Sequence, residues 1–225
     1  MHISDGILSA PVLAAGFAGT AILAAATLRK MDMDEIPKIS VITSVFFIAS
    51  LIHIPVGPSS VHLILNGLVG IVLGWRAFPA IMLGIILQTL LFGHGGLTVI
   101  GVNSVMLGGG GLLAYMVWQL RHRFTLPKKE VVFGALAGAT GIISSGIILA
   151  LALITTGDEF MATAAFALVA HVPVMIVEAI VVGACAGYLA KVKPEVLAGY
   201  IRPTPRASKS TAKAAVDGKQ DDTTP

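Results

Sequence analysis

The chain has 225 residues, of which 56% are hydrophobic and 12% are charged, and its mean hydropathy is +0.89. Because soluble domains carry about 25% charged residues, this chain has too few to cover a water-facing surface, which excludes an ordinary soluble enzyme and a disordered protein. The 15 Lys and Arg residues against 12 Asp and Glu residues leave a net charge of +3, too small to indicate a nucleic-acid partner. The composition instead predicts an all-α, polytopic membrane protein.

Apolar stretches long enough to cross a lipid bilayer recur along the chain, since a membrane-spanning helix needs roughly 17–25 such residues. Segments rich in Pro and Gly separate several of them, for example IPVGPSS (54–60) and GWRAFP (74–79). The last stretch is long enough to be kinked, and Pro173 lies inside it. We therefore predict seven transmembrane helices, at 7–28, 39–55, 60–75, 77–93, 102–120, 131–155 and 160–190.

The basic residues test this count, because cytoplasmic loops are enriched in Lys and Arg. With seven helices, all 15 fall on one side of the membrane: in 29–38, at Arg76, in 121–129 and after residue 190. The N-terminus and the loops after the second, fourth and sixth helices contain none. This distribution predicts an N-terminus outside and a C-terminus in the cytoplasm. The N-terminus also lacks the basic region of a cleaved signal peptide.

The chain divides into one membrane domain and a tail. Residues 1–200 carry the apolar stretches, whereas residues 201–225 are rich in Pro, Ser, Thr, Lys and Asp, which predicts a disordered cytoplasmic tail. Within the membrane domain, GGGG (108–111) and GALAGATG (134–141) predict closely packed helices, because small residues let transmembrane backbones approach one another.

Five of the six histidines fall on the predicted outer side, where a substrate would arrive. His53 and His94 also fit a structural role at the membrane interface. His171 lies within the last predicted helix, with Glu178 two turns further along the same face. Ionisable residues inside a membrane are costly and suggest function, although this pair is equally compatible with a structural role.

His2 offers a metal chelate, because a large second residue disfavours removal of Met1. The terminal amine and the residue-2 amide nitrogen close a five-membered ring on a metal, and that amide and the imidazole Nδ1 close a six-membered ring. An amide nitrogen binds only when deprotonated, which Ni(II) and Cu(II) promote, and both ions prefer square-planar or tetragonal nitrogen sites. A second imidazole would complete the plane, with His62 as the first choice and His53 and His94 as alternatives.

The energy source is not encoded in this chain, because it has no GxxxxGK[ST] phosphate-binding loop. No Ser-His-Asp or Cys-His arrangement stands out either, so we expect a protein that is not an enzyme. Active transport would then draw on a partner or an ion gradient. Two rival functions remain open: a stand-alone secondary metal transporter coupled to protons through His171 and Glu178, and a membrane assembly or sensor protein with structural histidines.

Three blocks of the sequence resemble the CbiM/NikM family, the substrate-capturing membrane subunits of energy-coupling-factor (ECF-type) importers for nickel and cobalt. The blocks are MHISDG at the N-terminus, IHIPVGPSSVHLILNGLVGIVLG (52–74) and AFPAIMLGIILQTLLFGHGGLTVIGVN (77–103). The resemblance covers roughly residues 1–190, and the three blocks in order are far more specific than a Met-His start.

The resemblance implies a seven-helix fold, in which one extra N-terminal helix joins a six-helix substrate-subunit core. It implies that Ni(II) or Co(II) is the transported substrate, held by Met1, His2 and, through the SVHLILNG motif, His62. Further residues in the matching blocks are candidates for lining the site or orienting its ligands, namely His53, Asn66, His94 and Asn103. The implied partners, in the inner membrane of a prokaryote, are ATPase subunits and a transmembrane coupling subunit. Many members of the family also have a small accessory membrane protein, which would be separate from this chain or absent.

Overall fold

The computed structural model describes residues 2–29, 31–56 and 59–200, and it describes the side chains of all of these except 53–56 and 59–62. The predicted tail (201–225) and Met1 therefore lie outside the described residues. So do the side chains of His53 and His62, whose backbones are described.

Helices dominate this structure, as the all-α prediction requires. In lipid only helices and closed barrels satisfy every backbone polar group, so an apolar chain with helical spacing folds in this way. The α-helices are α1 (Ala10–Leu28), α2 (Ile36–Ala49), α3 (Asn66–Leu73), α4 (Ala77–Phe92), α5 (Ile100–Gln119), α6 (Lys129–Ile154), α7 (Met161–Ala170) and α8 (Val172–Val192). Short 3-10 turns are η1 (Met33–Glu35), η2 (Gly74–Arg76), η3 (Leu120–Arg123), η4 (Asp158–Phe160) and η5 (Pro194–Val196). One antiparallel hairpin joins β1 (His53–Val56) to β2 (Ser59–His62).

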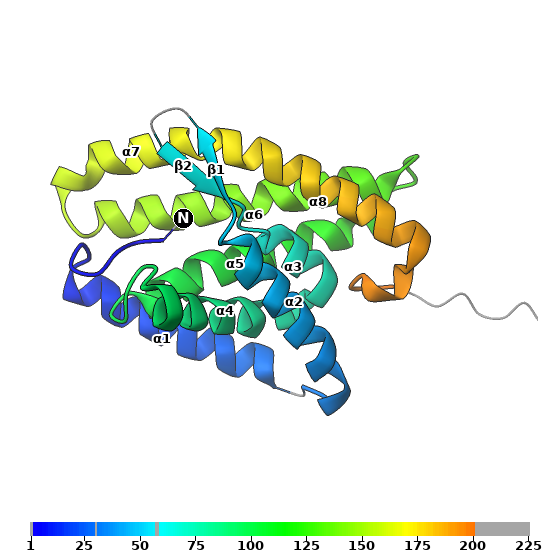
Figure 1. Ribbon diagram of the computed structural model, residues 1–225, viewed down its shortest axis with the longest axis horizontal. Helices are drawn as coiled ribbons and strands as arrows, with labels where there is room; N and C mark the ends of the chain where they lie inside the picture. The colour runs from blue at the N-terminus through cyan, green and yellow to red at the C-terminus, as the bar shows by residue number, and fades with distance from the viewer. Residues whose placement is uncertain (1, 30, 57–58, 201–225) are drawn as a thin grey trace, which may run out of the picture.

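The helices pack as a bundle around α5 and α6. Figure 1 shows α7 and α8 almost in line along one edge, with α6 beside them, α5 in the middle and α1 along the opposite edge. Large apolar side chains on the two edges face outward: Ile22 of α1 is 69% exposed and Phe166 of α7 is 74% exposed. Such side chains would be costly in water, so these edges fit a lipid environment.

Five segments of the described residues are long and apolar enough to cross a membrane. They are Ala10–Leu28, Asn66–Phe92, Ile100–Arg123, Lys129–Ile154 and Asp158–Val192. The predicted kink in the last segment is present, since α7 ends at Ala170 and α8 begins at Val172, one residue before Pro173. Pro173 has no backbone N–H to donate to the preceding turn.

The third predicted helix, 60–75, is wrong as a continuous helix. Residues 59–62 form β2, Leu65 has a left-handed backbone (φ 55°), and only the eight residues of α3 are helical before Gly74 (φ 61°) ends the helix. The second predicted helix, 39–55, is likewise too long, because α2 ends at Ala49 and the chain enters β1 at His53. Irregular backbone at membrane depth is tolerated where protein buries it.

The short helix α3 and its neighbour α4 run in opposite directions along α5. Gly70 of α3 lies against the Gly111 carbonyl, and Gly74 then reaches the Tyr115 ring. The chain turns there, and Ala77 of α4 returns to the level of Gly111. The segment of β2, a short loop and α3 thus leads to Gly74, where the chain reverses into α4.

The glycine-rich motifs form the close helix contacts predicted for them. A Cβ on Gly111 would lie 2.8 Å from Ile81 of α4, and one on Gly134 would lie 2.5 Å from Ala186 of α8. At Gly141 a Cβ would meet the Asn66 side chain of α3 at 2.5 Å. Helices α5 and α6 can therefore approach their neighbours only because these positions have no side chain.

The described basic residues that make contacts within the bundle gather at one end of it. Arg76 bonds to the carbonyl oxygens of Thr27 and Arg29 and forms an ion pair with Glu35, with Nε and Oε2 2.8 Å apart. At the same end, Arg121 donates to the Ala198 carbonyl, and the Ala198 amide donates to the carbonyl of Ile71 at the end of α3. The N-terminal segment lies at the other end, where α1 and α5 begin.

Candidate metal site

The N-terminal segment, residues 2–9, folds back into the bundle. Ile3 is only 3% exposed and Leu8 is also buried, so the segment is part of the core although it precedes the first helix. Figure 1 shows it in dark blue, running from the start of α1 towards the interior. Burial of two apolar side chains stabilises this position, but the polar backbone of the segment also needs partners.

Asn103, in the first turn of α5, supplies two of those partners. Its Oδ1 accepts from the Ile3 N–H at 3.0 Å, and its Nδ2 donates to the Ile3 carbonyl at 3.1 Å. The side chain is buried, so both bonds are shielded from water. This pair of bonds fixes both the position and the orientation of the residue that follows His2. Asn103, a candidate for orienting the site, therefore acts on the backbone of the N-terminal segment.

The loop between α4 and α5 holds the next part of the segment. The Asp5 N–H donates to the Gly95 carbonyl at 3.0 Å, and Asp5 Oδ1 accepts from both the N–H and the Oγ1 of Thr98. At Gly96 (φ 136°) a Cβ would fall 2.1 Å from the Asp5 carboxylate. The glycines of this loop therefore leave room for residues 3–5, a contact between segments far apart in the sequence that only the tertiary structure shows.

His2 and His94 are brought together at this end of the bundle. Their ring centroids lie 6.1 Å apart, and His94 is also 6.1 Å from the Phe92 ring. In the hairpin, the backbone register places His53 directly opposite His62. The predicted ligand set includes Met1 and the His62 side chain, which lie outside the described residues, so it stays a prediction.

Asn66 lies elsewhere, at the centre of the bundle. Its Nδ2 is 3.0 Å from Ser145 Oγ and 3.2 Å from the Gly141 carbonyl, both on α6, and 3.4 Å from the Leu107 carbonyl on α5. The residue is fully buried. Asn66 therefore ties the start of α3 to the two central helices, and its described contacts are structural ones.

His171 and Glu178 have different partners. The His171 Nδ1 lies 2.5 Å from the Ala167 carbonyl, one turn earlier in the chain. The Glu178 carboxylate instead accepts from backbone N–H groups of Ile64 and Leu65. The described hydrogen bonds of both residues are therefore made to backbone groups, within α7 for His171 and in the loop before α3 for Glu178.

No group of three or more His, Cys, Asp and Glu side chains with metal-site geometry occurs among the described side chains. The predicted chelate is not a cluster of this kind, because two of its donors are an amine and a backbone amide nitrogen rather than side chains. The three-nitrogen chelate at the end of the N-terminal segment therefore stays a prediction.

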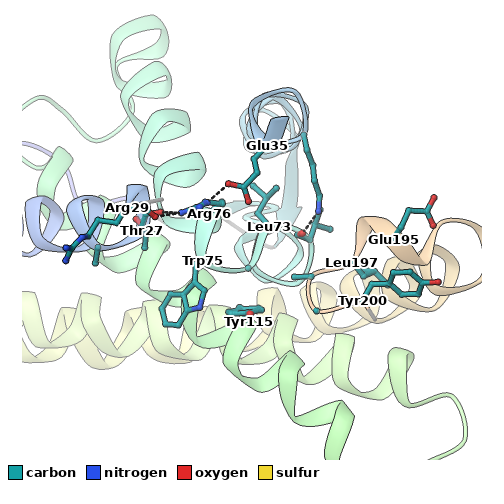
Figure 2. A pocket seen from close by; sticks show the side chains of 16 residues that line it. Thr27, Arg29, Glu35, Leu73, Trp75, Arg76, Tyr115, Glu195, Leu197 and Tyr200 are labelled. Carbon is teal, nitrogen blue, oxygen red and sulfur yellow. Dashed lines mark hydrogen bonds and ion pairs between the residues drawn. The ribbon is translucent and has the colours of Figure 1, made fainter. Parts of the chain in front are cut away.

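A pocket of about 770 Å³ opens at the opposite, basic end of the bundle. Figure 2 shows Trp75 and Tyr115 on one side of it, Tyr200 and Glu195 on another, and Arg76 bonded to Glu35 at its rim. Lys38 donates to the Val72 carbonyl at the end of α3. The pocket is far from the N-terminal segment and is a separate feature.

The chain is similar to known metal transport proteins over most of its length. A family profile described as the cobalt uptake substrate-specific transmembrane region, CbiM, matches residues 2–196. The chain is 34% identical over 199 residues to a Haemophilus influenzae protein described as a metal transport protein, covering 88% of this chain and 97% of that one. It is 32% identical over 216 residues to a Methanocorpusculum labreanum protein described as cobalt transport protein CbiM 1, covering 88% and 92% of the two chains.

A third relative is the fused nickel transport protein NikMN of Rhodobacter capsulatus, 30% identical over 159 residues, which cover 67% of this chain and 46% of that longer protein. Two solved structures titled as a transition metal transporter, one of them truncated, match with TM-scores of 0.72 and 0.71, each at 26% identity. They cover 85% and 84% of this chain, and it covers 93% and 98% of theirs.

The fold and these matches define a multi-pass membrane protein of the transition-metal transport class. More specifically, the chain belongs to the CbiM family, the membrane components of cobalt and nickel uptake. The resemblance found in the three sequence blocks is thereby confirmed.

Proposed function

We propose that this chain captures Ni(II) or Co(II) at the outer side of the membrane as the substrate-binding subunit of an ATP-driven, ECF-type importer. The observation that carries the proposal is the pair of hydrogen bonds between Asn103 and Ile3. Together with the burial of Ile3, these bonds hold the N-terminal segment inside the bundle, where a chelate formed by Met1 and His2 would face histidines of later segments.

The proposed ligands are the Met1 amine, the His2 amide nitrogen and imidazole, and the His62 imidazole. A planar set of four nitrogen atoms favours Ni(II) over Co(II), because Ni(II) prefers square-planar nitrogen sites. His94, whose ring lies 6.1 Å from that of His2, would line the site.

The proposed orientation follows from the distribution of charge. Lys38, Arg76 and Arg121 lie at the end of the bundle opposite the N-terminal segment, and basic residues favour the cytoplasmic side. Seven passes through the inner membrane of a prokaryote then place the N-terminus outside. The ATPase subunits and the coupling subunit would act on the basic end, near the pocket of Figure 2, with the small accessory protein beside them in the membrane.

Titration of the purified protein with nickel, cobalt, copper and zinc tests the site. We expect one tightly bound nickel or cobalt ion and loss of binding when a single residue is added before Met1, because the extension removes the amine and shifts the imidazole. His62→Ala should weaken binding, whereas His122→Ala, at the basic end, should not. Tight nickel binding by the extended protein would refute the proposed ligands.

Uptake into vesicles tests the proposed energy source. We expect the chain alone to transport no nickel without ATP and partner subunits, since it has no phosphate-binding loop. ATP-independent uptake driven by a proton gradient would refute the importer role and favour a secondary transporter.

A further inference from the structure

Glu178 is a fully buried carboxylate in the first half of α8. A buried charge is costly unless hydrogen bonds compensate for it. The described contacts of this carboxylate are concentrated on one short segment far away in the sequence, the loop between β2 and α3. The backbone of Glu178, by contrast, packs against Gly138 of α6, where a Cβ would lie 2.7 Å from the Glu178 carbonyl. The close contact of these two helices fixes the position of the Glu178 backbone.

One oxygen of this carboxylate holds two consecutive backbone amides. Glu178 Oε1 accepts from the Ile64 N–H at 2.5 Å and from the Leu65 N–H at 2.7 Å. Both amides precede the first turn of α3 and have no carbonyl of their own helix to bond to. Leu65 also has a left-handed backbone (φ 55°), which costs about 1 kcal/mol or more in a residue other than Gly. The two hydrogen bonds to Glu178 stabilise that conformation.

These bonds act close to His62, because only Leu63 separates it from Ile64. The backbone of His62 is held on one side by its pairing with His53 in the hairpin. On the other side, Glu178 holds Ile64 and Leu65, and Asn66 is bonded to α5 and α6. Glu178 thus holds the backbone of Ile64 and Leu65, and the side chain of Asn66 anchors the next residue to the two central helices.

We propose that Glu178 is a positioning residue for metal capture: it holds the backbone of the loop after β2 so that His62 reaches the metal held by Met1 and His2. The inference rests on the proposed function, since it requires His62 to be the fourth ligand. Glu178 is not one of the proposed ligands and acts through the loop backbone that it holds. Its role is comparable to the outer partners of metal-binding histidines, whose removal costs about 10- to 100-fold in affinity.

Three variants separate this role from general destabilisation. Glu178→Met keeps the length of the side chain and removes the acceptor, Glu178→Gln keeps an acceptor oxygen and removes the charge, and Glu178→Asp shortens the side chain by one methylene. As a control, Val182→Ala opens a cavity one turn further along α8, where Val182 is fully buried. Melting temperature, nickel affinity and the visible absorption spectrum of the nickel complex are measured for each.

We expect Glu178→Met and Glu178→Asp to lower nickel affinity by about 10- to 100-fold and to shift the visible band to longer wavelength, as His62→Ala does, because one nitrogen ligand is lost. Glu178→Gln should retain the affinity and the spectrum of the unaltered protein. Val182→Ala should lower the melting temperature and leave the nickel affinity and the visible spectrum unchanged. If Glu178→Met does not fold, Glu178→Asp supplies the same comparison.

A double-mutant cycle gives the decisive result, since a residue that acts only through His62 has no further effect once His62 is absent. Glu178→Met in the His62→Ala background should bind nickel as the single His62→Ala variant does. Any of three results would overturn the inference. The first is an equal loss of nickel affinity in both backgrounds. The others are unaltered affinity in Glu178→Met and Glu178→Asp, and a Glu178→Gln variant that binds nickel as weakly as Glu178→Met. If the unaltered protein binds nickel and a one-residue N-terminal extension abolishes binding, the proposed function survives such a result. If the extension has no effect, both fall.

Discussion

Replacing Asn103 by Leu should undock the N-terminal segment. The two side chains have nearly the same shape, so the substitution removes both bonds to Ile3 and leaves little room for water to replace them. Each buried polar group left without a partner costs about 1–3 kcal/mol. The substitution would leave two groups without a partner, the N–H and the carbonyl of Ile3. Each is bonded at 3.0–3.1 Å to the Asn103 side chain, which is 1% exposed.

The docked state of the segment should therefore lose about 2–4 kcal/mol, allowing for partial relaxation. Because 1.4 kcal/mol corresponds to a tenfold change, nickel affinity should fall by about 30- to 700-fold where the undocked state becomes dominant. Where the docked state stays dominant, the loss in affinity is smaller. The weaker docking then shows as faster hydrogen exchange of the amides of residues 3–5.

The assay combines nickel titration with hydrogen exchange measured by mass spectrometry on the N-terminal peptide. Ser104→Ala is the matched control, because Ser104 is the next residue of α5, is equally buried, and its Oγ has no hydrogen-bond partner among the described residues. An Asn103→Leu protein with the affinity and the exchange rate of the Ser104→Ala control would refute the argument that Asn103 holds the segment.

Three further substitutions test separate parts of the structure. Gly138→Ala should lower the melting temperature in detergent, since its Cβ would lie 2.7 Å from the Glu178 carbonyl and overpacking costs about 1–3 kcal/mol. Gly109→Ala should leave the melting temperature unchanged, because its Cβ has its nearest neighbour at 3.7 Å. Equal melting temperatures of the two variants would contradict the packing. Thr98→Val removes the hydroxyl bond to the Asp5 carboxylate and should weaken nickel binding by about 2- to 12-fold at most, because a hydrogen bond contributes about 0.5–1.5 kcal/mol. An effect as large as that of Asn103→Leu would show that the loop is the main anchor. Arg76→Met should speed protease cleavage between α1 and α2, which Arg76 bridges, and an unchanged cleavage rate would argue against that bridge.

Much of the membrane architecture could be predicted because it depends on local composition. Apolar stretches, breaks at Pro and Gly, and the positions of Lys and Arg are all visible along the chain. The break at His171, which Pro173 imposes, was predicted from that pattern, and so was the close packing at Gly111, Gly134 and Gly141. The family also followed from local blocks of sequence.

The structure of residues 60–75 could not be predicted in this way. Residues 60–75 are apolar, and an apolar stretch buried in protein has the same composition as one buried in lipid. Nothing local indicates that Leu65 takes a left-handed backbone or that Glu178, 113 residues away, accepts from its amide. The expectation of a regular helix therefore failed where a distant carboxylate satisfied the backbone.

A helical membrane protein could be recognised from the amino-acid sequence alone, because hydropathy and charge are properties of each segment; the placement of most histidines on the outer side stays a prediction. Only the tertiary structure decided that Ile3 docks on Asn103, 100 residues later in the chain, and that the glycines at 95 and 96 make room for the N-terminal segment. Hydrogen bonds between distant segments depend on how the helices pack, and helix packing is a property of the whole bundle.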